Sequence, residues 1–97
     1  MVYKLVVTEH ADKLLDNLVY HLLYRLKNEQ AAMHLLDGIE DIYSRLEENP
    51  FQFPISKDTV LSLRGYREAV VHRMNYTVIF NRDIFVSVLR YVQKAID

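Results

Sequence analysis

The spacing of apolar residues changes once along this chain, and that change limits the folds it can adopt. In the first half, apolar side chains recur every three or four residues, which is the period of an α-helix. In the second half, they alternate and are mostly β-branched or aromatic, as in strands. After a short opening strand, the chain is therefore predicted to build helices and then the remaining strands of a sheet.

Two helices are expected. The first should cover about 9–27, and its apolar stripe consists of Ala11, Leu14, Leu15, Leu18, Leu22 and Leu26. The second should follow Asn28, and its stripe consists of Ala32, Leu35, Leu36, Ile39, Ile42, Tyr43 and Leu46. Thr8 and Asn28 can cap the two helices, because their side-chain oxygens accept hydrogen bonds from unpaired amides. Pro50 ends the second helix. The short link between the helices predicts an antiparallel hairpin.

Four strands complete the expected fold. The first covers 2–7, and three more cover 67–73, 76–81 and 84–91, with tight turns at 74–75 and 82–83. A loop with two prolines, 49–58, precedes the last three. The fold class is therefore α+β, in the order β-α-α-β-β-β, with a helical hairpin packed on a twisted antiparallel sheet. The first strand is expected at one edge of that sheet or in its middle.

The length, composition and charge of the chain limit its number of domains and its expected location. Ninety-seven residues predict a single domain, 1–97. No secretion signal or membrane-spanning run is apparent, and cysteine is absent, so the expected location is the cytoplasm. Residues 1–49 hold five Lys or Arg against nine Asp or Glu, a charge of −4, whereas residues 50–97 hold seven against four, a charge of +3.

The sequence lacks the residues that nucleotide-binding loops, metal sites and serine nucleophiles need. Gly38 and Gly65 are the only glycines, so the sequence has neither a P-loop nor a dinucleotide fingerprint, and no cofactor is expected. The four histidines are scattered without metal-ligand spacing, so no metal site is expected. No serine has the surroundings of a catalytic nucleophile.

The most prominent remaining feature is a group of basic and aromatic residues from Leu63 onward. Strand alternation would place Arg67 and Arg73 on one face of the sheet. Such a face could stack bases and bind phosphates, or it could accept an acidic peptide; it could also be ordinary surface. The residues alone leave these three interpretations open.

Three local motifs, in this order, resemble the RelE/ParE superfamily of toxins from bacterial toxin–antitoxin pairs. The opening Tyr3-Lys4-Leu5-Val6-Val7-Thr8-Glu9-His10-Ala11 is similar to the family's first strand and turn. Ile42-Tyr43-Ser44-Arg45-Leu46-Glu47-Glu48-Asn49-Pro50 is similar to the end of its second helix. Its closing meander resembles 65–71, 75–80 and 88–92. The resemblance implies a toxin that a cognate antitoxin neutralises.

The resemblance also implies alternatives for the target. RelE-like members cut messenger RNA on the ribosome without a metal, using basic and Tyr side chains, whereas ParE-like members poison DNA gyrase. Thr77 stands where the RNA-cutting relatives place an arginine, and the residues after the last strand contain no tyrosine. Tyr66-Arg67-Glu68 and Leu89-Arg90 match the ParE-like pattern, although Gln93 replaces its usual histidine. The leading expectation is a gyrase poison acting by protein contact; the alternatives are a messenger RNA endonuclease and a non-toxic binding module.

Candidate site residues follow from the basic segment and from the resemblance. The catalytic role is unassigned, and the candidates for it are Arg67, Arg73, Arg90 and Lys94. The expected target-binding residues are Tyr66, Arg67, Arg73, Arg90, Tyr91 and Lys94. Tyr20, Tyr24 and Phe53 are the expected apolar anchors for the antitoxin. The expected partners are a cognate antitoxin and either DNA gyrase or the ribosome with its message, with no membrane; the sequence does not indicate an oligomeric state.

Overall fold

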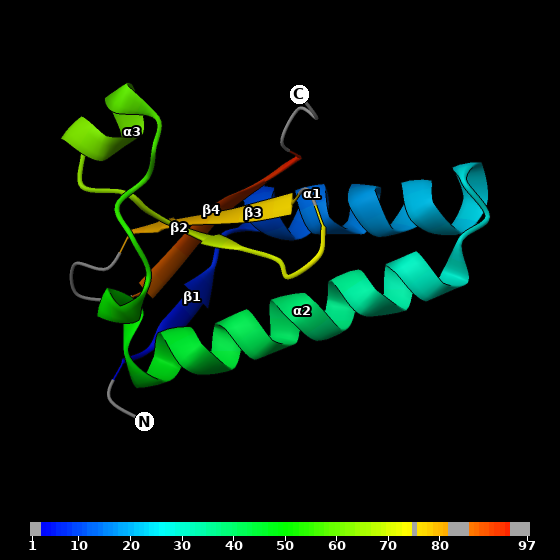
Figure 1. Ribbon diagram of the computed structural model, residues 1–97, viewed down its shortest axis with the longest axis horizontal. Helices are drawn as coiled ribbons and strands as arrows, with labels where there is room; N and C mark the ends of the chain where they lie inside the picture. The colour runs from blue at the N-terminus through cyan, green and yellow to red at the C-terminus, as the bar shows by residue number, and fades with distance from the viewer. Residues whose placement is uncertain (1–2, 75, 82–85, 94–97) are drawn as a thin grey trace.

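A computed structural model describes residues 3–74 and 76–81, together with the backbone of 86–93. A helical hairpin lies against a four-stranded sheet (Figure 1). The elements, in chain order, are β1 (Leu5–Val7), α1 (Glu9–Tyr20), a π-helix (His21–Arg25), α2 (Glu29–Glu48), a 3-10 helix (Pro50–Gln52), α3 (Thr59–Leu63), β2 (Arg67–Val70), β3 (Tyr76–Asn81) and β4 (Val86–Gln93). The predicted α+β fold class, with a hairpin on a sheet, is confirmed.

Both predicted helix caps are present. The Thr8 hydroxyl accepts a hydrogen bond from the Ala11 amide at 3.1 Å, and the Asn28 side chain accepts one from Ala31 at 3.0 Å. These bonds satisfy amides that would otherwise lack a partner in the first turn. The helix α2 ends at Glu48, before Pro50, as predicted.

The first helix differs from the prediction at its end. Regular α-helical geometry stops at Tyr20, and a π-helix continues over His21–Arg25. The Leu26 amide donates to the His21 carbonyl, five residues back, at 3.0 Å. Lys27 then takes a left-handed conformation with φ 49°, which reverses the chain into α2. The hairpin therefore turns through a wider helical turn and a left-handed residue.

The sheet has the strand order β1-β4-β3-β2. The first strand lies at an edge, which is one of the two expected positions. It pairs with β4 in parallel, with Leu5 opposite Val86, while β4, β3 and β2 pair antiparallel. The predicted antiparallel meander of the last three strands is therefore present, while the parallel pairing of β1 makes the sheet mixed instead of wholly antiparallel. Parallel neighbours need a long connection, and almost the whole chain separates β1 from β4.

The turn between β2 and β3 lies earlier than the sequence suggested. The strand β2 ends at Val70, and the Met74 amide donates to the Val71 carbonyl at 3.1 Å. Arg73 has a φ of 63°, inside the turn. The prediction of a strand through Arg73 was wrong, because its β-branched neighbours resemble a strand while the chain is already reversing.

The other strand predictions can be compared only in part. The strand β3 has the predicted bounds, 76–81, whereas β4 covers 86–93 in place of 84–91. The predicted turn at Arg82–Asp83 lies outside the described residues. One register shift interrupts the β3–β4 ladder between Ile79 and Phe80.

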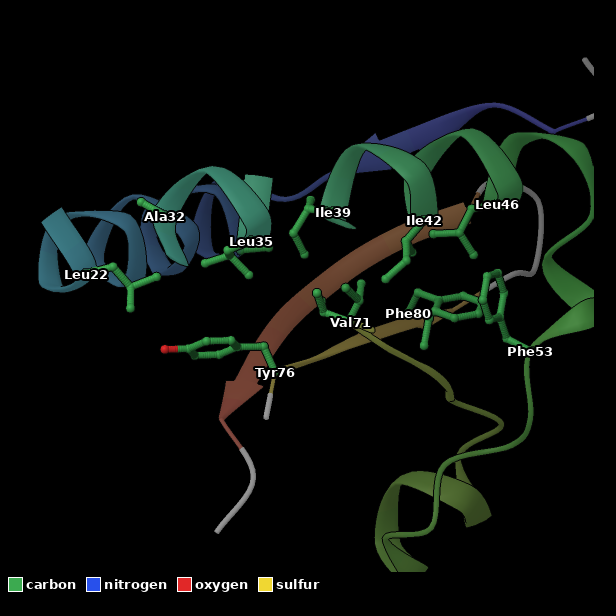
Figure 2. Packing of buried hydrophobic residues seen from close by; sticks show 13 residues of the cluster. Leu22, Ala32, Leu35, Ile39, Ile42, Leu46, Phe53, Val71, Tyr76 and Phe80 are labelled. Atoms are coloured by element: carbon green, nitrogen blue, oxygen red, sulfur yellow. The ribbon is translucent and has the colours of Figure 1, made fainter. Parts of the chain in front are cut away.

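The hydrophobic core lies between α2 and the sheet, and its residues point toward one another in Figure 2. Leu22, Leu35, Ile39, Ile42 and Leu46, all predicted for the core, are buried. Leu15 and Leu18 are partly buried and pack against this cluster. The sheet contributes Ala69, Val71, Tyr76, Val78 and Phe80.

The helix α3 was not predicted. Five residues are too few for an apolar period to show, although the Asp58 side chain caps the helix by accepting from Leu61 at 3.1 Å. Within the described residues, no helix has the length and apolar character that a membrane crossing requires.

Candidate functional site

Arg67, the first candidate, supports the loop before α3. Its Nη1 donates to the Phe53 carbonyl oxygen at 2.6 Å, and its guanidinium lies 5.4 Å from the centre of the Phe51 ring. The side chain is half-buried. In register, Arg67 faces Phe80, so it shares the helix side of the sheet with the core residues. Its charge is therefore used within the fold, and it does not pair with Glu68.

Arg73 is exposed at the β2–β3 turn and lines a hollow of about 480 Å³ with residues at the start of α2. His34, from α2, makes a hydrogen bond of 2.8 Å between its Nε2 and the carbonyl oxygen of His72. This bond ties the turn to the helix. Arg67 and Arg73 lie on different segments, so the shared strand face predicted for them is not present.

The remaining target-binding candidates are only partly described. Tyr66 is half-buried before β2, where its amide donates to Leu61 and its carbonyl accepts from Ser56. In the backbone register of β4, Arg90 stands opposite Ile79 and Tyr91 opposite Val78. Lys94 lies outside the described residues.

The face of the sheet turned away from the helices is closed at its centre. Glu68, Thr77 and Ile79 are all exposed by 5% or less. Glu68 Oε1 and Thr77 Oγ1 are buried and have no hydrogen-bond partner in the described structure. Burial of Glu68 could not be predicted from its residue type, because a charged residue in an edge strand usually reaches solvent.

Two of the three expected antitoxin anchors are accessible. Tyr20 is 60% and Tyr24 65% exposed, and their ring centroids lie 4.8 Å apart at the tip of the hairpin. Phe53 is only 7% exposed, so in this structure it offers little surface to a partner. Its ring packs edge-on against Phe80 at 5.8 Å, and the Arg45 guanidinium lies 4.8 Å from its centre.

A hollow between α1 and α2 was missed by the sequence analysis. It has a volume of about 410 Å³ and is lined by Leu15, Leu36, Ile39, Glu40 and Tyr43. The Tyr43 hydroxyl is buried there without a hydrogen-bond partner among the described residues. Burial, with the nearby charge of Asp12, raises the pKa of Tyr43 well above its ordinary value. The exposed apolar residue Leu36 was the available signal, but its helical period assigned it to the core.

Metal ligands do not gather in the described part of the chain: no three His, Cys, Asp or Glu side chains there are placed to hold an ion.

Comparison with known proteins identifies the fold. No protein-family model matches the chain, and no curated protein does. A chain of a solved structure, described as the chromosomal ParDE TA system from P. aeruginosa, superposes with a TM-score of 0.74. The match has 19% sequence identity and covers 95% of this chain and 96% of the other. The protein thus has the fold of a ParDE system chain.

Proposed function

We propose that this protein is the toxin of a bacterial toxin–antitoxin pair, neutralised by a cognate antitoxin in the cytoplasm, and that it acts on DNA gyrase by protein contact. The observation that carries the proposal is the fold match to a chain of a ParDE TA system over 95% of this chain. The motifs Tyr66-Arg67-Glu68 and Leu89-Arg90 lie on or beside the matched strands and favour the ParE-like branch.

Two features favour contact with a protein over cleavage of RNA. A metal-independent nuclease needs cations at the scissile phosphate. Arg67 already donates to the Phe53 carbonyl, and Thr77 stands buried where RNA-cutting relatives place an arginine. On the face of the sheet that holds Thr77, the strand β2 places Glu68, a carboxylate that would repel a phosphate.

The proposed target-binding set keeps the candidates Tyr66, Arg73, Arg90, Tyr91 and Lys94, although Arg90 and Tyr91 occupy successive positions of β4 and so do not share one face of the sheet. Arg67 belongs to it as a supporting residue, because it holds the loop at Phe53. For the antitoxin, the proposed anchors are the exposed pair Tyr20 and Tyr24. Tyrosine and arginine are the residues most often found at energetically important interface positions.

The experiment is to express the protein with and without the product of the neighbouring gene. Toxicity should appear only without that product, together with cleaved DNA–gyrase complexes. Arg73→Ala and Arg90→Ala should each reduce the poisoning of purified gyrase at least several-fold. Arg25→Ala, on the hairpin tip, is the matched control and should leave it unchanged.

Two results would contradict this proposal in different ways. Ribosome-dependent cleavage of a defined message by the unmodified protein would favour the endonuclease. Harmless expression in the absence of any antitoxin would favour a non-toxic binding module.

A further inference from the structure

The turn between β2 and β3 and the start of α2 enclose a polar hollow, called here the Arg73 hollow. The turn curves toward α2 (Figure 1), and His34 Nε2 donates to the His72 carbonyl at 2.8 Å. The volume of the hollow is about 480 Å³, within the usual range for binding sites. Its lining consists of Asn28, Gln30, Ala31, His34, Arg73 and Met74. The hollow is therefore large enough for one side chain and the backbone next to it.

Arg73 is the permanent charge in this lining, and none of the other lining residues is acidic. Among the described residues, the guanidinium groups of Arg45 and Arg67 have hydrogen-bond partners, whereas that of Arg73 has neither a hydrogen bond nor an ion pair. The Arg73 side chain is also exposed. An unpaired guanidinium beside a hollow without an acid is available to an anion from outside the chain.

The backbone at Arg73 is not the one that an arginine prefers. Its φ of 63° is left-handed, a conformation that glycine or asparagine adopts with less strain. The turn around it is fixed, because Met74 donates to the Val71 carbonyl at 3.1 Å and Val71 donates to that of Tyr76 at 2.9 Å. Strained residues of this kind gather at functional sites. The need for a turn alone therefore does not account for an arginine at this position.

The other groups of the hollow favour a carboxylate carried by a protein segment. A guanidinium binds a carboxylate through two parallel hydrogen bonds. The exposed amide of Gln30 can pair with the backbone of such a segment, and Ala31 and Met74 offer apolar contact to its stem. A nucleic acid fits less well, because a polyanion needs several cations acting together. The lining holds one arginine, and Glu29 is its acidic neighbour in the chain.

We propose that the Arg73 hollow receives an acidic side chain of the target protein, with Arg73 binding its carboxylate and Gln30 the adjoining backbone. The inference rests on the proposed function, since it gives one member of the target-binding set its chemistry. The helix start contributes side chains here and not a free amide at Ala31, because the Asn28 side chain already accepts from that amide at 3.0 Å.

The chemistry can be tested on the full chain with three probes. These are a blocked Gly-Glu-Gly peptide, its Gly-Gln-Gly counterpart and a short single-stranded DNA. Nuclear magnetic resonance shifts of the Ala31 and Met74 amides should show roughly 10-fold tighter binding of the glutamate peptide than of the glutamine peptide. Equal affinities of the two peptides would overturn carboxylate recognition. Tighter binding of the DNA at the same amides would assign the hollow to phosphate, against the proposal.

The variant Arg73→Gly separates binding from folding. Glycine adopts a φ of 63° readily, so the variant should stay folded and should not melt at a lower temperature. It should nevertheless lose the shifts caused by the glutamate peptide and bind purified gyrase roughly 10-fold more weakly. Arg73→Lys keeps the charge without the paired donors and should recover only part of the affinity.

The matched control is Arg64→Ala, which removes an exposed arginine after α3 and should change neither measurement. An equal loss in Arg64→Ala would mean attraction to net charge alone and would overturn the site. A full recovery in Arg73→Lys would also count against it, because a carboxylate held by two parallel hydrogen bonds needs the guanidinium.

The same variants separate this inference from the proposed function. If gyrase binds the protein but tolerates Arg73→Gly, the hollow is not a target contact, although the proposed function stands. If gyrase does not bind and expression is harmless, the proposed function fails, whatever the glutamate peptide does. If Arg73→Gly instead abolishes a self-association seen by sedimentation, or only the binding of the neighbouring gene product, the acid comes from a second copy or from the antitoxin, against the proposal.

Discussion

Gly38 lies where α2 approaches the chain closely just after β2. A Cβ added there would lie 2.6 Å from the Cγ1 of Val71, a side chain that is fully buried. Real Cβ atoms do not come so close to another carbon, so a side chain at position 38 would force the helix and the sheet apart. The glycine inside α2 therefore serves the packing between layers.

Gly38→Ala should consequently destabilise the protein by about 1–3 kcal/mol, as overpacking of a core does. Alanine favours a helix over glycine by about 1 kcal/mol, which offsets only part of this loss. The measurement is the free energy of unfolding in urea. Val71→Ala in the same chain should recover part of the difference, and Ser44→Ala, on the exposed side of α2, should change stability little. A Gly38→Ala protein as stable as wild type would mean that α2 can move away freely.

Tyr43 makes stability depend on alkaline pH. Burial first, and Asp12 second, raise its pKa above the ordinary value of 10.0. The folded protein therefore holds the phenol proton more tightly than the unfolded chain, and this contribution is fully present below pH 10. It is lost as pH rises from there toward the folded pKa. Urea midpoints above pH 10 should fall less steeply for Tyr43→Phe than for wild type; parallel slopes would contradict the buried phenol.

The candidate site shows what residue types alone can and cannot predict. Tyr20 and Tyr24 were expected as apolar anchors from their residue type alone, and both are exposed at the tip of the hairpin. Phe53 and Arg67 were misjudged, because their roles depend on contacts between segments distant in sequence: Phe53 packs on Phe80, and Arg67 binds the Phe53 carbonyl. Arg73 was misplaced because a left-handed arginine has no local signal.

At the scale of elements, the ends of helices could be predicted where a nearby residue determines them by capping or by its ring geometry. Two helix starts are marked by Thr8 and Asn28, whose side chains accept hydrogen bonds from amides a few residues away. The end of α2 is marked by Pro50, whose ring restricts the residue before it. The π-helix and α3 could not be predicted, because each covers a single turn. The parallel pairing of β1 with β4 has no local signal either, since it joins the two ends of the chain.

The segment 50–56 depends on two arginines for its position. Arg67 donates to the Phe53 carbonyl, while Arg45 donates to Gln52 at 2.9 Å and covers the Phe53 ring. Arg67→Ala should cost about 1.5–3 kcal/mol, the usual worth of a hydrogen bond from a charged group. It should also speed proteolysis within 50–56.

The comparison variant is Arg64→Ala, which removes an exposed arginine that follows α3 and should leave stability and cleavage rate unchanged. The deciding comparison for Arg67→Ala is between its loss of stability and its loss of growth inhibition. If Arg67→Ala kept full stability but lost all growth inhibition, its role would be at the target and not in the loop.

At the scale of the whole molecule, the sheet is completed by β4, which lies between β1 and β3. A chain ending at residue 85 would leave β1 without a partner and β3 paired only with β2. We expect it to keep some helical signal in circular dichroism but to lose cooperative melting, because an open sheet cannot hold the core closed. Full-length Ser44→Ala, treated in parallel, should melt cooperatively. A cooperative melt of the shortened chain would show that β4 is dispensable.

Because β4 lies between β1 and β3, a newly synthesised molecule cannot complete its sheet until β4 has been made. The hairpin is complete at Glu48, but the strand that joins β1 to the meander ends at Gln93. At synthesis rates of about 5–20 residues per second, roughly 2–9 s separate these two points. Throughout that interval the apolar face of α2 lacks the complete sheet, because β4 is made last. A companion protein already present would therefore meet the hairpin before the sheet is closed.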